Sequence, residues 1–286
     1  MSEVTNNQEW TAVEYSVQDG IARIVLNRPQ YRNAQNSEMT YQIERAMYLA
    51  GQDDDVRVIV LSGNGPSFSA GHDIASPGRD VNTYFPPIGT WPSHIGKPGA
   101  EGRLAREEEV YMEMCRRWRD LSKPTIAMVH GYCIGGGLML AWVCDLIVAS
   151  DDAQFCDPVV RFGVPGVEYF SHPWEFGVRK AKQFLFTGQF VTAEEAHRLG
   201  MVNEVYPKED LEAKTLELAG KIAQMPPFAV QLAKKAVNES WDAMGYRIAM
   251  NTTFALHHVA HSHNAETTGD SMINYKSDGK LKDSRQ

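Results

Sequence analysis

Three adjacent glycines near the middle of the chain, Gly135, Gly136 and Gly137, constrain its fold more than any other feature. They interrupt an apolar run, residues 129–141, whose first half has the pattern of a strand and whose second half has that of a helix. Because glycine has no Cβ, the backbone can turn sharply here and come close to another molecule. The first N–H groups of a helix have no partner inside it, so they can donate to an oxygen that carries developing negative charge. The motif predicts either an oxyanion-binding turn or a tight structural turn between strand and helix.

The composition is that of a globular protein with room for a substantial core. Of the 286 residues 43% are hydrophobic, and the net charge of −8 comes without a basic face, which argues against nucleic acid as a partner. An anionic small ligand would need a local cluster of Lys or Arg. Residues 1–12 lack the apolar segment of a signal peptide, and the apolar run at 138–143 is too short to cross a membrane. Four isolated cysteines predict reduced thiols and a cytoplasmic location.

Strand and helix patterns alternate along the chain, which indicates an α/β fold. A hairpin is expected at 13–17 and 21–26, then a helix at 38–51 capped by Ser37, then a buried strand at 56–61. Further strands are expected at 124–130, 145–149, 154–156 and 201–206, and helices at 103–121, 193–200, 210–224, 227–237 and 241–261. Residues 76–102 show no period and contain Tyr84, Phe85 and Trp91, so they predict a functional lid or a poorly ordered loop.

Five motifs in a fixed order resemble the crotonase family, the enoyl-CoA hydratase/isomerase superfamily. They are LNRPQYRNAQ at 26–35, FSAGHDI at 68–74, KPTIAMVHGYCIGGG at 123–137, CDLIVASDDAQF at 144–155 and TAEEAHRLGMVNEVYP at 192–207. The resemblance implies a spiral of ββα turns with a helical C-terminal trimerisation region, assembled as a homotrimer or a dimer of trimers. We therefore expect a core at 1–207 carrying the acyl-CoA site and a helical region at 208–286 that oligomerises and covers the site.

The family's shared chemistry is an oxyanion hole of two backbone N–H groups that holds a thioester oxygen in an enolate-like state. By position in the motifs, the resemblance places these donors on Ala70 and Gly136. Main-chain donors fixed in a dry turn need no reorganisation as charge develops, and one such donor is worth about 3 kcal/mol. Coenzyme A is implied as part of the substrate, with no permanently bound cofactor.

The chain departs from the family's hydratases at both acid–base positions. Hydratases carry two glutamates, and the motifs align these positions with Met139 and Val159. A thioether and an isopropyl group have no useful pKa, so the two-glutamate hydration mechanism cannot run here. The sequence favours an isomerase or another enolate-forming reaction over hydration.

Two nearby carboxylates are candidates for a single base. Asp157 lies two residues before Val159 and would share its face on a strand, although it could equally be a turn or cap residue ahead of Pro158. Glu168 lies close to where some family isomerases place their base, and its alternative is a solvated loop carboxylate. An isomerase needs one base only, because it moves one proton between the α and γ carbons.

Binding residues are expected in the two N-terminal motifs. Arg28 and Arg32 are candidates for the CoA phosphates, since guanidinium groups pair well with phosphate, and the alternative is a solvated face. His72, Asp73 and Ile74 are candidate CoA contacts beside the first oxyanion donor, where His72 shapes the loop or touches CoA rather than acting as a base. The aromatic residues of the 76–102 segment would then form a lid over the acyl chain, or simply anchor the loop.

A histidine cluster near the C-terminus raises the question of a metal. His257 and His261 have i, i+4 spacing on a predicted helix, with His258 and His263 nearby. Glu266 is the one carboxylate close in sequence, so we expect no metal site and assign the cluster to a helix surface or subunit contact. The sequence leaves three functions open: an acyl-CoA enzyme, a non-catalytic acyl-CoA binder, and a scaffold without CoA binding.

Overall fold

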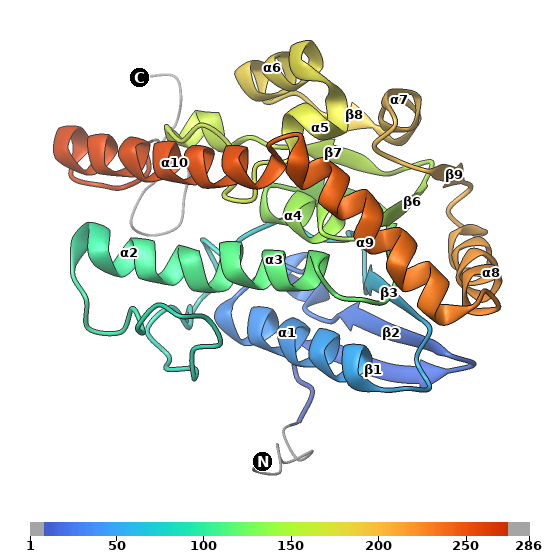
Figure 1. Ribbon diagram of the computed structural model, residues 1–286. Coiled ribbons are helices and arrows are strands. Elements are labelled where there is room, and N and C mark those ends of the chain that lie inside the picture. The colour runs from blue at the N-terminus through green and yellow to red at the C-terminus, as the bar shows by residue number, and fades with distance from the viewer. Residues whose placement is uncertain (1–8, 274–286) are drawn as a thin grey trace.

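The computed structural model describes residues 9–273, which form two β-sheets surrounded by helices (Figure 1). The strands are β1 (Val13–Gln18), β2 (Ile21–Leu26), β3 (Val58–Gly63), β4 (Thr125–Val129), β5 (Tyr132–Ile134), β6 (Leu146–Ser150), β7 (Gln154–Cys156), β8 (Val191–Thr192) and β9 (Glu204–Tyr206). The α-helices are α1 (Ser37–Gln52), α2 (Gly99–Glu107), α3 (Met114–Arg119), α4 (Gly136–Trp142), α5 (His172–Phe176), α6 (Val178–Thr187), α7 (Ala193–Leu199), α8 (Leu211–Ala223), α9 (Pro227–Ala243) and α10 (Tyr246–Thr268). Short helices of other types are η1 (Pro29–Tyr31), η2 (Glu108–Glu113) and η3 (Val159–Phe162).

The chain winds as a spiral that visits both sheets in turn. The larger sheet has the order β1-β2-β3-β4-β6-β9, with β1 antiparallel to β2 and the other neighbours parallel. The smaller sheet has the order β5-β7-β8. β4 is followed directly by β5, and β6 by β7, so these two turns each add a strand to both sheets. This is the expected ββα spiral, and the helical C-terminal region is also present.

The larger sheet is buried on both faces, as its apolar strands predict. β3 carries Val58 and Val60 toward one face and Ile59 and Leu61 toward the other, all fully buried. One face packs on α8, and the other faces the main core of α1, α3 and α4. Since α8 completes the cover of the sheet, a domain boundary at 207 would separate this helix from the core to which it belongs.

Most predicted elements are present, with instructive differences. The hairpin and the Thr192 cap of α7 are confirmed, whereas the cap of α1 is Asn36 and not Ser37: its side chain accepts from the Met39 N–H at 3.1 Å. The predicted helix at 103–121 is interrupted by the π-helical η2. Helices α5 and α6 were not predicted, because Pro173, Gly177 and Gly188 break up their short apolar pattern.

The long segment before α2 is fixed at two points. The Asp80 carboxylate accepts from the Ser37 and Glu38 N–H groups, both at 2.8 Å, at the start of α1. The Glu109 carboxylate accepts from the Ile88 and Gly89 N–H groups at 2.6 and 3.0 Å. The segment is therefore an ordered loop without regular structure.

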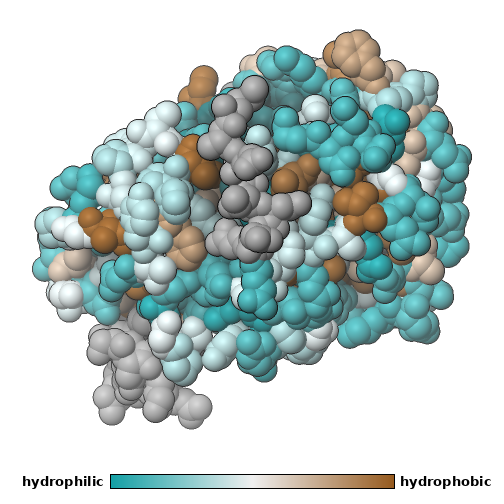
Figure 2. Space-filling view, turned by 90° about the horizontal axis from the view of Figure 1, so that it is seen from below, coloured by the Kyte–Doolittle hydropathy of each residue, from teal (hydrophilic) through white to brown (hydrophobic). Residues whose placement is uncertain are grey.

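The C-terminal helices place distant parts of the sequence side by side. α10 runs alongside α2 and α3, across the upper part of the molecule in Figure 1. Seen from below, the surface is mostly hydrophilic with separate hydrophobic residues (Figure 2). Within residues 9–273, none of the helices has the length and apolar content needed to cross a bilayer.

Candidate active site

Two glycine-containing backbone segments meet at the centre of the site. The Ile134 N–H donates to the Ser69 carbonyl at 3.0 Å, which ties the FSAGHDI loop to β5. Gly71 has a φ of +90°, and a Cβ there would lie 2.6 Å from the Ile134 oxygen and 3.0 Å from the Gly136 nitrogen. Both the conformation and the close approach require glycine. The backbones of the two loops therefore lie in direct contact.

The free N–H in the first loop belongs to His72, and the prediction of Ala70 is wrong by two residues. The Ala70 N–H donates to the Arg32 carbonyl at 2.9 Å, so it is not available to a ligand. The Gln35 N–H donates to the Gly71 carbonyl at 2.7 Å, and the Asp73 N–H donates to the Gln35 carbonyl at 2.9 Å. In such a parallel bridge the N–H of the residue between 71 and 73 faces the other way.

The second predicted donor, Gly136, keeps a free N–H. Neither it nor the His72 N–H donates a hydrogen bond to any part of the chain that the structure describes. The two groups lie on adjoining backbone segments, and the ring of His72 lies against the Gly136 Cα. This pair of unused donors is the arrangement that an oxyanion hole requires.

A cavity of about 630 Å³ opens beside these loops. It is lined by parts of five segments, residues 72–74, 79–82, 94–111, 159–168 and 257–272. Its size is that of a pocket for a small organic ligand. His72 and Glu168 both lie in its wall, so the cavity connects the glycine loops with a carboxylate.

Glu168 is the predicted base that the structure brings to the site. Its Oε2 lies 3.7 Å from the His72 Nε2 and has no hydrogen-bond partner among the described residues. Burial raises the pKa of this carboxyl well above its usual range, and the nearby Glu107 adds to the effect. The His72 ring stacks on Tyr111 at 3.8 Å, and burial lowers the pKa of His72 to about 3. The site thus holds a neutral imidazole beside a carboxyl that retains its proton to unusually high pH.

Asp157, the other predicted base, does not reach the cavity. Its side chain has no exposed surface, and its oxygens accept from the Val167 N–H at 2.9 Å and the Val159 N–H at 3.2 Å. The His172 Nε2 lies 2.9 Å from Oδ2. Two of these contacts hold the 157–167 turn and the third holds His172, so the structure gives Asp157 the alternative role of a turn residue.

Val159 and Met139, which stand where hydratases have glutamates, lie in helical segments and not on a strand. β7 ends at Cys156, and Val159 begins the 3-10 helix η3, so Asp157 and Val159 do not share a strand face. Val159 lines the cavity, whereas Met139 is 2% exposed within α4. Neither side chain can exchange a proton.

The predicted CoA-binding residues separate into two groups. Arg28 pairs with Asp73 at 2.9 Å, and Asp73 also accepts from the Ser76 N–H at 2.9 Å, so these two side chains brace the loop and are not free for phosphate. Burial opposes the charge on Asp73, but bonds from Ser76 and Arg28 outweigh it and lower the pKa. Arg32 is exposed and makes no side-chain bond within residues 9–273, and Ile74 lines the cavity.

The predicted aromatic lid is wrong, and basic residues line the cavity instead. Phe85 stacks on Tyr41 of α1 at 4.6 Å, Tyr84 is 62% exposed, and Trp91 lines a different depression. These aromatic residues anchor the loop, which was the alternative. The cations that line the cavity are Arg79, Lys97, Arg103 and Arg106.

The C-terminal histidines face inward, against the prediction of a helix surface. His257 and His261 are 3% and 5% exposed, and both line the cavity together with Glu107 of α2. Burial lowers the pKa of His257 to about 4 and also lowers that of His261. Burial would raise the pKa of Glu107, but His258, His257 and His261 outweigh it and lower the pKa.

Glu107 and Tyr111 were missed from the sequence. Both belong to a charged helical stretch whose inward face is set by η2, and a π-helical insertion has no clear sequence signature. Gln35 was also missed, although it lies in a quoted motif and its Oε1 would be 3.2 Å from a Cβ at Gly136.

The spiral fold brings two glycine loops with unused backbone N–H groups together beside one cavity. A model of the enoyl-CoA hydratase/isomerase family matches residues 16–83 and 99–282. The chain belongs to the enoyl-CoA hydratase/isomerase family, an enzyme family acting on acyl-CoA.

Individual relatives agree with this assignment. The chain is 46% identical over 272 residues to the “Putative enoyl-CoA hydratase EchA13” of Mycobacterium tuberculosis, covering 93% of this chain and 85% of that one. It is 30% identical over 235 residues to the hydroxycinnamoyl-CoA hydratase-lyase of Pseudomonas fluorescens, covering 80% and 79%. The crystal structure of a probable enoyl-CoA hydratase from Mycobacterium smegmatis matches with a TM-score of 0.83 and 44% identity, over 92% of this chain and 100% of that chain.

Proposed function

We propose that the protein is an acyl-CoA enzyme that forms a thioester enolate and moves a proton with Glu168. The thioester oxygen would accept from the N–H groups of His72 and Gly136, and the acyl carbons would lie in the cavity beside Glu168. The observation that carries the proposal is the pair of unused backbone donors beside a cavity with a buried carboxyl.

The reaction that suits one carboxyl is isomerisation of an enoyl-CoA. In this step the deprotonated form of Glu168, whose population is limited by the raised pKa, takes the α-proton of a 3-enoyl thioester, and the C–H electron pair moves into the conjugated dienolate. The two N–H groups stabilise the negative oxygen, each contributing about 3 kcal/mol. Glu168 then returns the proton to the γ-carbon, and the double bond lies between Cα and Cβ. No water is consumed, which fits Met139 and Val159 in place of the hydratase glutamates.

Coenzyme A would enter past the basic residues of the cavity. Arg79, Lys97 and Arg106 line it, and Arg32 is an exposed residue of the first motif. The Arg103 Nε is buried without a hydrogen-bond partner in the described chain, so it is suited to an anionic ligand. Phosphates carry the negative charge that these side chains require.

Proton exchange at the α-carbon tests the proposal without knowledge of the acyl group. A saturated acyl-CoA is incubated with enzyme in D₂O, and loss of the α-proton signal is followed by NMR, alongside isomerisation of a 3-enoyl-CoA. Glu168→Gln should lower both rates by about 10²–10⁴-fold. Glu175→Gln, which changes a carboxyl outside the cavity, is the matched control and should keep wild-type rates. Unchanged exchange in Glu168→Gln would refute the role of Glu168.

The loss of both hydratase glutamates supports a second candidate, a non-catalytic acyl-CoA binder. Calorimetry distinguishes the two: binding of acyl-CoA with neither exchange nor turnover supports the binder. Any exchange that depends on Glu168 excludes it.

We also propose that the predicted homotrimer, or a dimer of trimers, forms through the C-terminal helices in the cytoplasm. Apolar side chains are exposed on α9 and α10, including Phe228 at 70%, Val237 at 64% and Ile248 at 72%. All four cysteines are buried and unpaired, which suits a reducing compartment. Light scattering coupled to size exclusion gives the mass in solution, and a monomer would contradict the assembly.

A further inference from the structure

We propose that Glu107, His257 and His261 bind a divalent transition-metal ion of the zinc class at the wall of the cavity. All three residues are buried, and one ligand atom from each lies within 4.8 Å of the others. This inference concerns metal binding and stands independently of the proposed reaction.

The tautomers of both histidines are fixed by backbone carbonyls. The His257 Nδ1 lies 2.8 Å from the Gly166 oxygen, and the His261 Nδ1 lies 2.7 Å from the Ser271 oxygen. A carbonyl oxygen only accepts, so each Nδ1 carries a proton and each Nε2 presents a lone pair. Metal-binding histidines have this arrangement, in which the second nitrogen donates to a carbonyl.

The two lone pairs point at one another. The Nε2 atoms of His257 and His261 are 2.9 Å apart, a distance at which two acceptors repel unless a proton or a cation lies between them. A cation would relieve the repulsion at this position.

Glu107 completes the ligand set. Its Oε1 lies 3.7 Å from the His261 Nε2, and its Oε2 lies 3.8 Å from the His257 Nε2. Ligand atoms around a tetrahedral zinc at ~2.1 Å lie about 3.4 Å apart, which falls between the distances observed. The residue is 9% exposed, and its Oε2 has no hydrogen-bond partner within residues 9–273. The His258 Nε2 lies 3.1 Å away but makes no aligned hydrogen bond to it, so this buried carboxylate oxygen is suited to a positive ion.

Further groups surround the site and leave one side open. The His258 Nε2 lies 3.1 Å from the Glu107 Oε2, and the Glu168 Oε1 lies 3.6 Å from the His257 Nε2. Two histidines and one glutamate are the ligand set of zinc sites that keep a position for water. Such a water, with a pKa near ~7, would supply acid–base chemistry in a cavity that lacks the hydratase glutamates.

Metal analysis of the untagged full-length protein tests the site without any thioester. The protein is stripped with a chelator, dialysed, titrated with Zn²⁺ in competition with a chromophoric chelator, and analysed for metal by mass spectrometry. We expect one ion per chain, and a Co²⁺ derivative with the absorption bands of a low-coordinate nitrogen and oxygen site.

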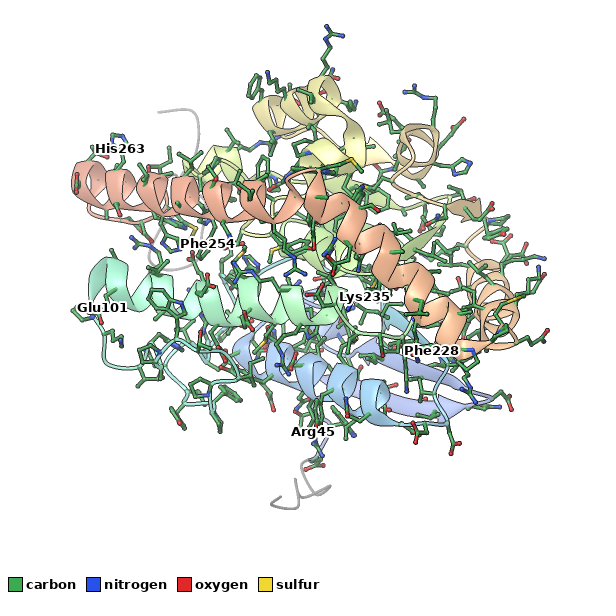
Figure 3. The ribbon with its side chains drawn as sticks, viewed as in Figure 1. Arg45, Glu101, Phe228, Lys235, Phe254 and His263 are labelled. Carbon is green, nitrogen blue, oxygen red and sulfur yellow. The ribbon has the colours of Figure 1, made fainter. Side chains whose placement is uncertain are left out.

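Three variants and one control give the assignment its specificity. His257→Ala, His261→Gln and Glu107→Gln should each weaken Zn²⁺ binding by more than ~100-fold. Changing a residue that only hydrogen-bonds to a ligand lowers the metal affinity by less than this. His263→Ala is the matched control: His263 is exposed and projects from the side of α10 opposite Phe254 (Figure 3). It should bind Zn²⁺ within about twofold of wild type. Circular dichroism checks folding, and His261→Gln preserves side-chain volume where alanine would leave a cavity.

The same variants give a second readout in thermal melting. Zn²⁺ should raise the Tm of the wild type and of His263→Ala but not that of His261→Gln. Failure of the wild type to bind a stoichiometric ion would overturn the proposal and indicate a proton shared by the two rings. Equal loss of binding in His263→Ala would overturn it as well. Neither result would affect α-proton exchange, so failure of the metal site and failure of the proposed reaction are distinguishable.

Discussion

Replacement of Gly136 by alanine should disable the oxyanion hole while leaving the fold intact. A Cβ at this position would lie 2.4 Å from the Cδ2 and Nε2 atoms of His72 and 3.2 Å from the Gln35 Oε1. Real Cβ atoms almost never approach within 3.0 Å, so the ring and the backbone must separate by at least 0.6 Å. The His72 ring stacks on Tyr111 at 3.8 Å, which limits its retreat.

The expected cost follows from the position of the clash. His72 and Gly136 supply the two proposed donors, so the displacement moves one N–H relative to the other. Loss of one oxyanion donor lowers kcat by about 10²–10³-fold, or about 2.7–4 kcal/mol of transition-state stabilisation. We expect a fall in kcat of this size.

The assay is α-proton exchange at saturating acyl-CoA, with two comparison variants. Gly220→Ala adds a methyl group in helix α8, where no atom lies within 4 Å, and should keep full activity with a stability gain of about 0.5–1 kcal/mol. His72→Ala combined with Gly136→Ala removes the clash and retains both N–H groups, so the double variant should be more active than Gly136→Ala alone. Wild-type exchange by Gly136→Ala, or no recovery in the double variant, would refute the reasoning.

Two further predictions concern carboxyl groups outside the cavity. Burial raises the pKa of Glu175 from 4.5 to about 7, so its contribution to stability is fully present below pH 4.5 and is lost as the pH rises to about 7. The free energy of unfolding falls by about 1–2 kcal/mol after allowance for partial exposure of the side chain. Urea unfolding should show Glu175→Gln to be more stable than the wild type at pH 8 but not at pH 4. If the stabilities of the two proteins changed in parallel with pH, the prediction would be contradicted. Asp157→Asn leaves a buried N–H of Val167 or the His172 ring without an acceptor, so it should lower stability by about 1–3 kcal/mol, seen as a Tm several degrees lower. An unchanged Tm with lost activity would show instead that Asp157 is catalytic.

Most strands and helices follow from the sequence because apolar periodicity reports burial. The run 56–61 predicts a strand buried on both faces, and β3 occupies the middle of the larger sheet. The predicted trimerisation stays a prediction. The missed pair α5 and α6 is short and punctuated by glycine and proline, so local pattern could not identify it.

The register of the oxyanion loop could not be obtained from glycine positions alone. Gly71 has a φ of +90°, which breaks the alternation of N–H directions along residues 69–73, and the partners of these N–H groups lie far away in sequence. Ala70 faces Arg32, while His72 faces away from Gln35. A donor prediction therefore requires knowledge of the pairing, which only the fold supplies.

The surroundings of the histidine cluster also depend on contacts between residues that are distant in the sequence. The i, i+4 spacing of His257 and His261 is visible in the sequence, but their carboxylate partner, Glu107, is 150 positions away on another helix. Packing of α10 against α2 brings the three together, and the π-helical η2 follows directly after Glu107. The sequence thus indicates a histidine face without its surroundings.

The proposed hydrogen bonds to the thioester can be observed by isotope-edited infrared spectroscopy. A saturated acyl-CoA labelled with ¹³C at the carbonyl is bound to the enzyme, and its C=O stretch is compared with that of the free ligand. Two backbone donors should polarise the carbonyl and lower the stretching frequency, and Gly136→Ala should reverse most of that shift. A bound thioester whose carbonyl frequency equals that in water, or one insensitive to Gly136→Ala, would contradict the assignment of His72 and Gly136 as its donors.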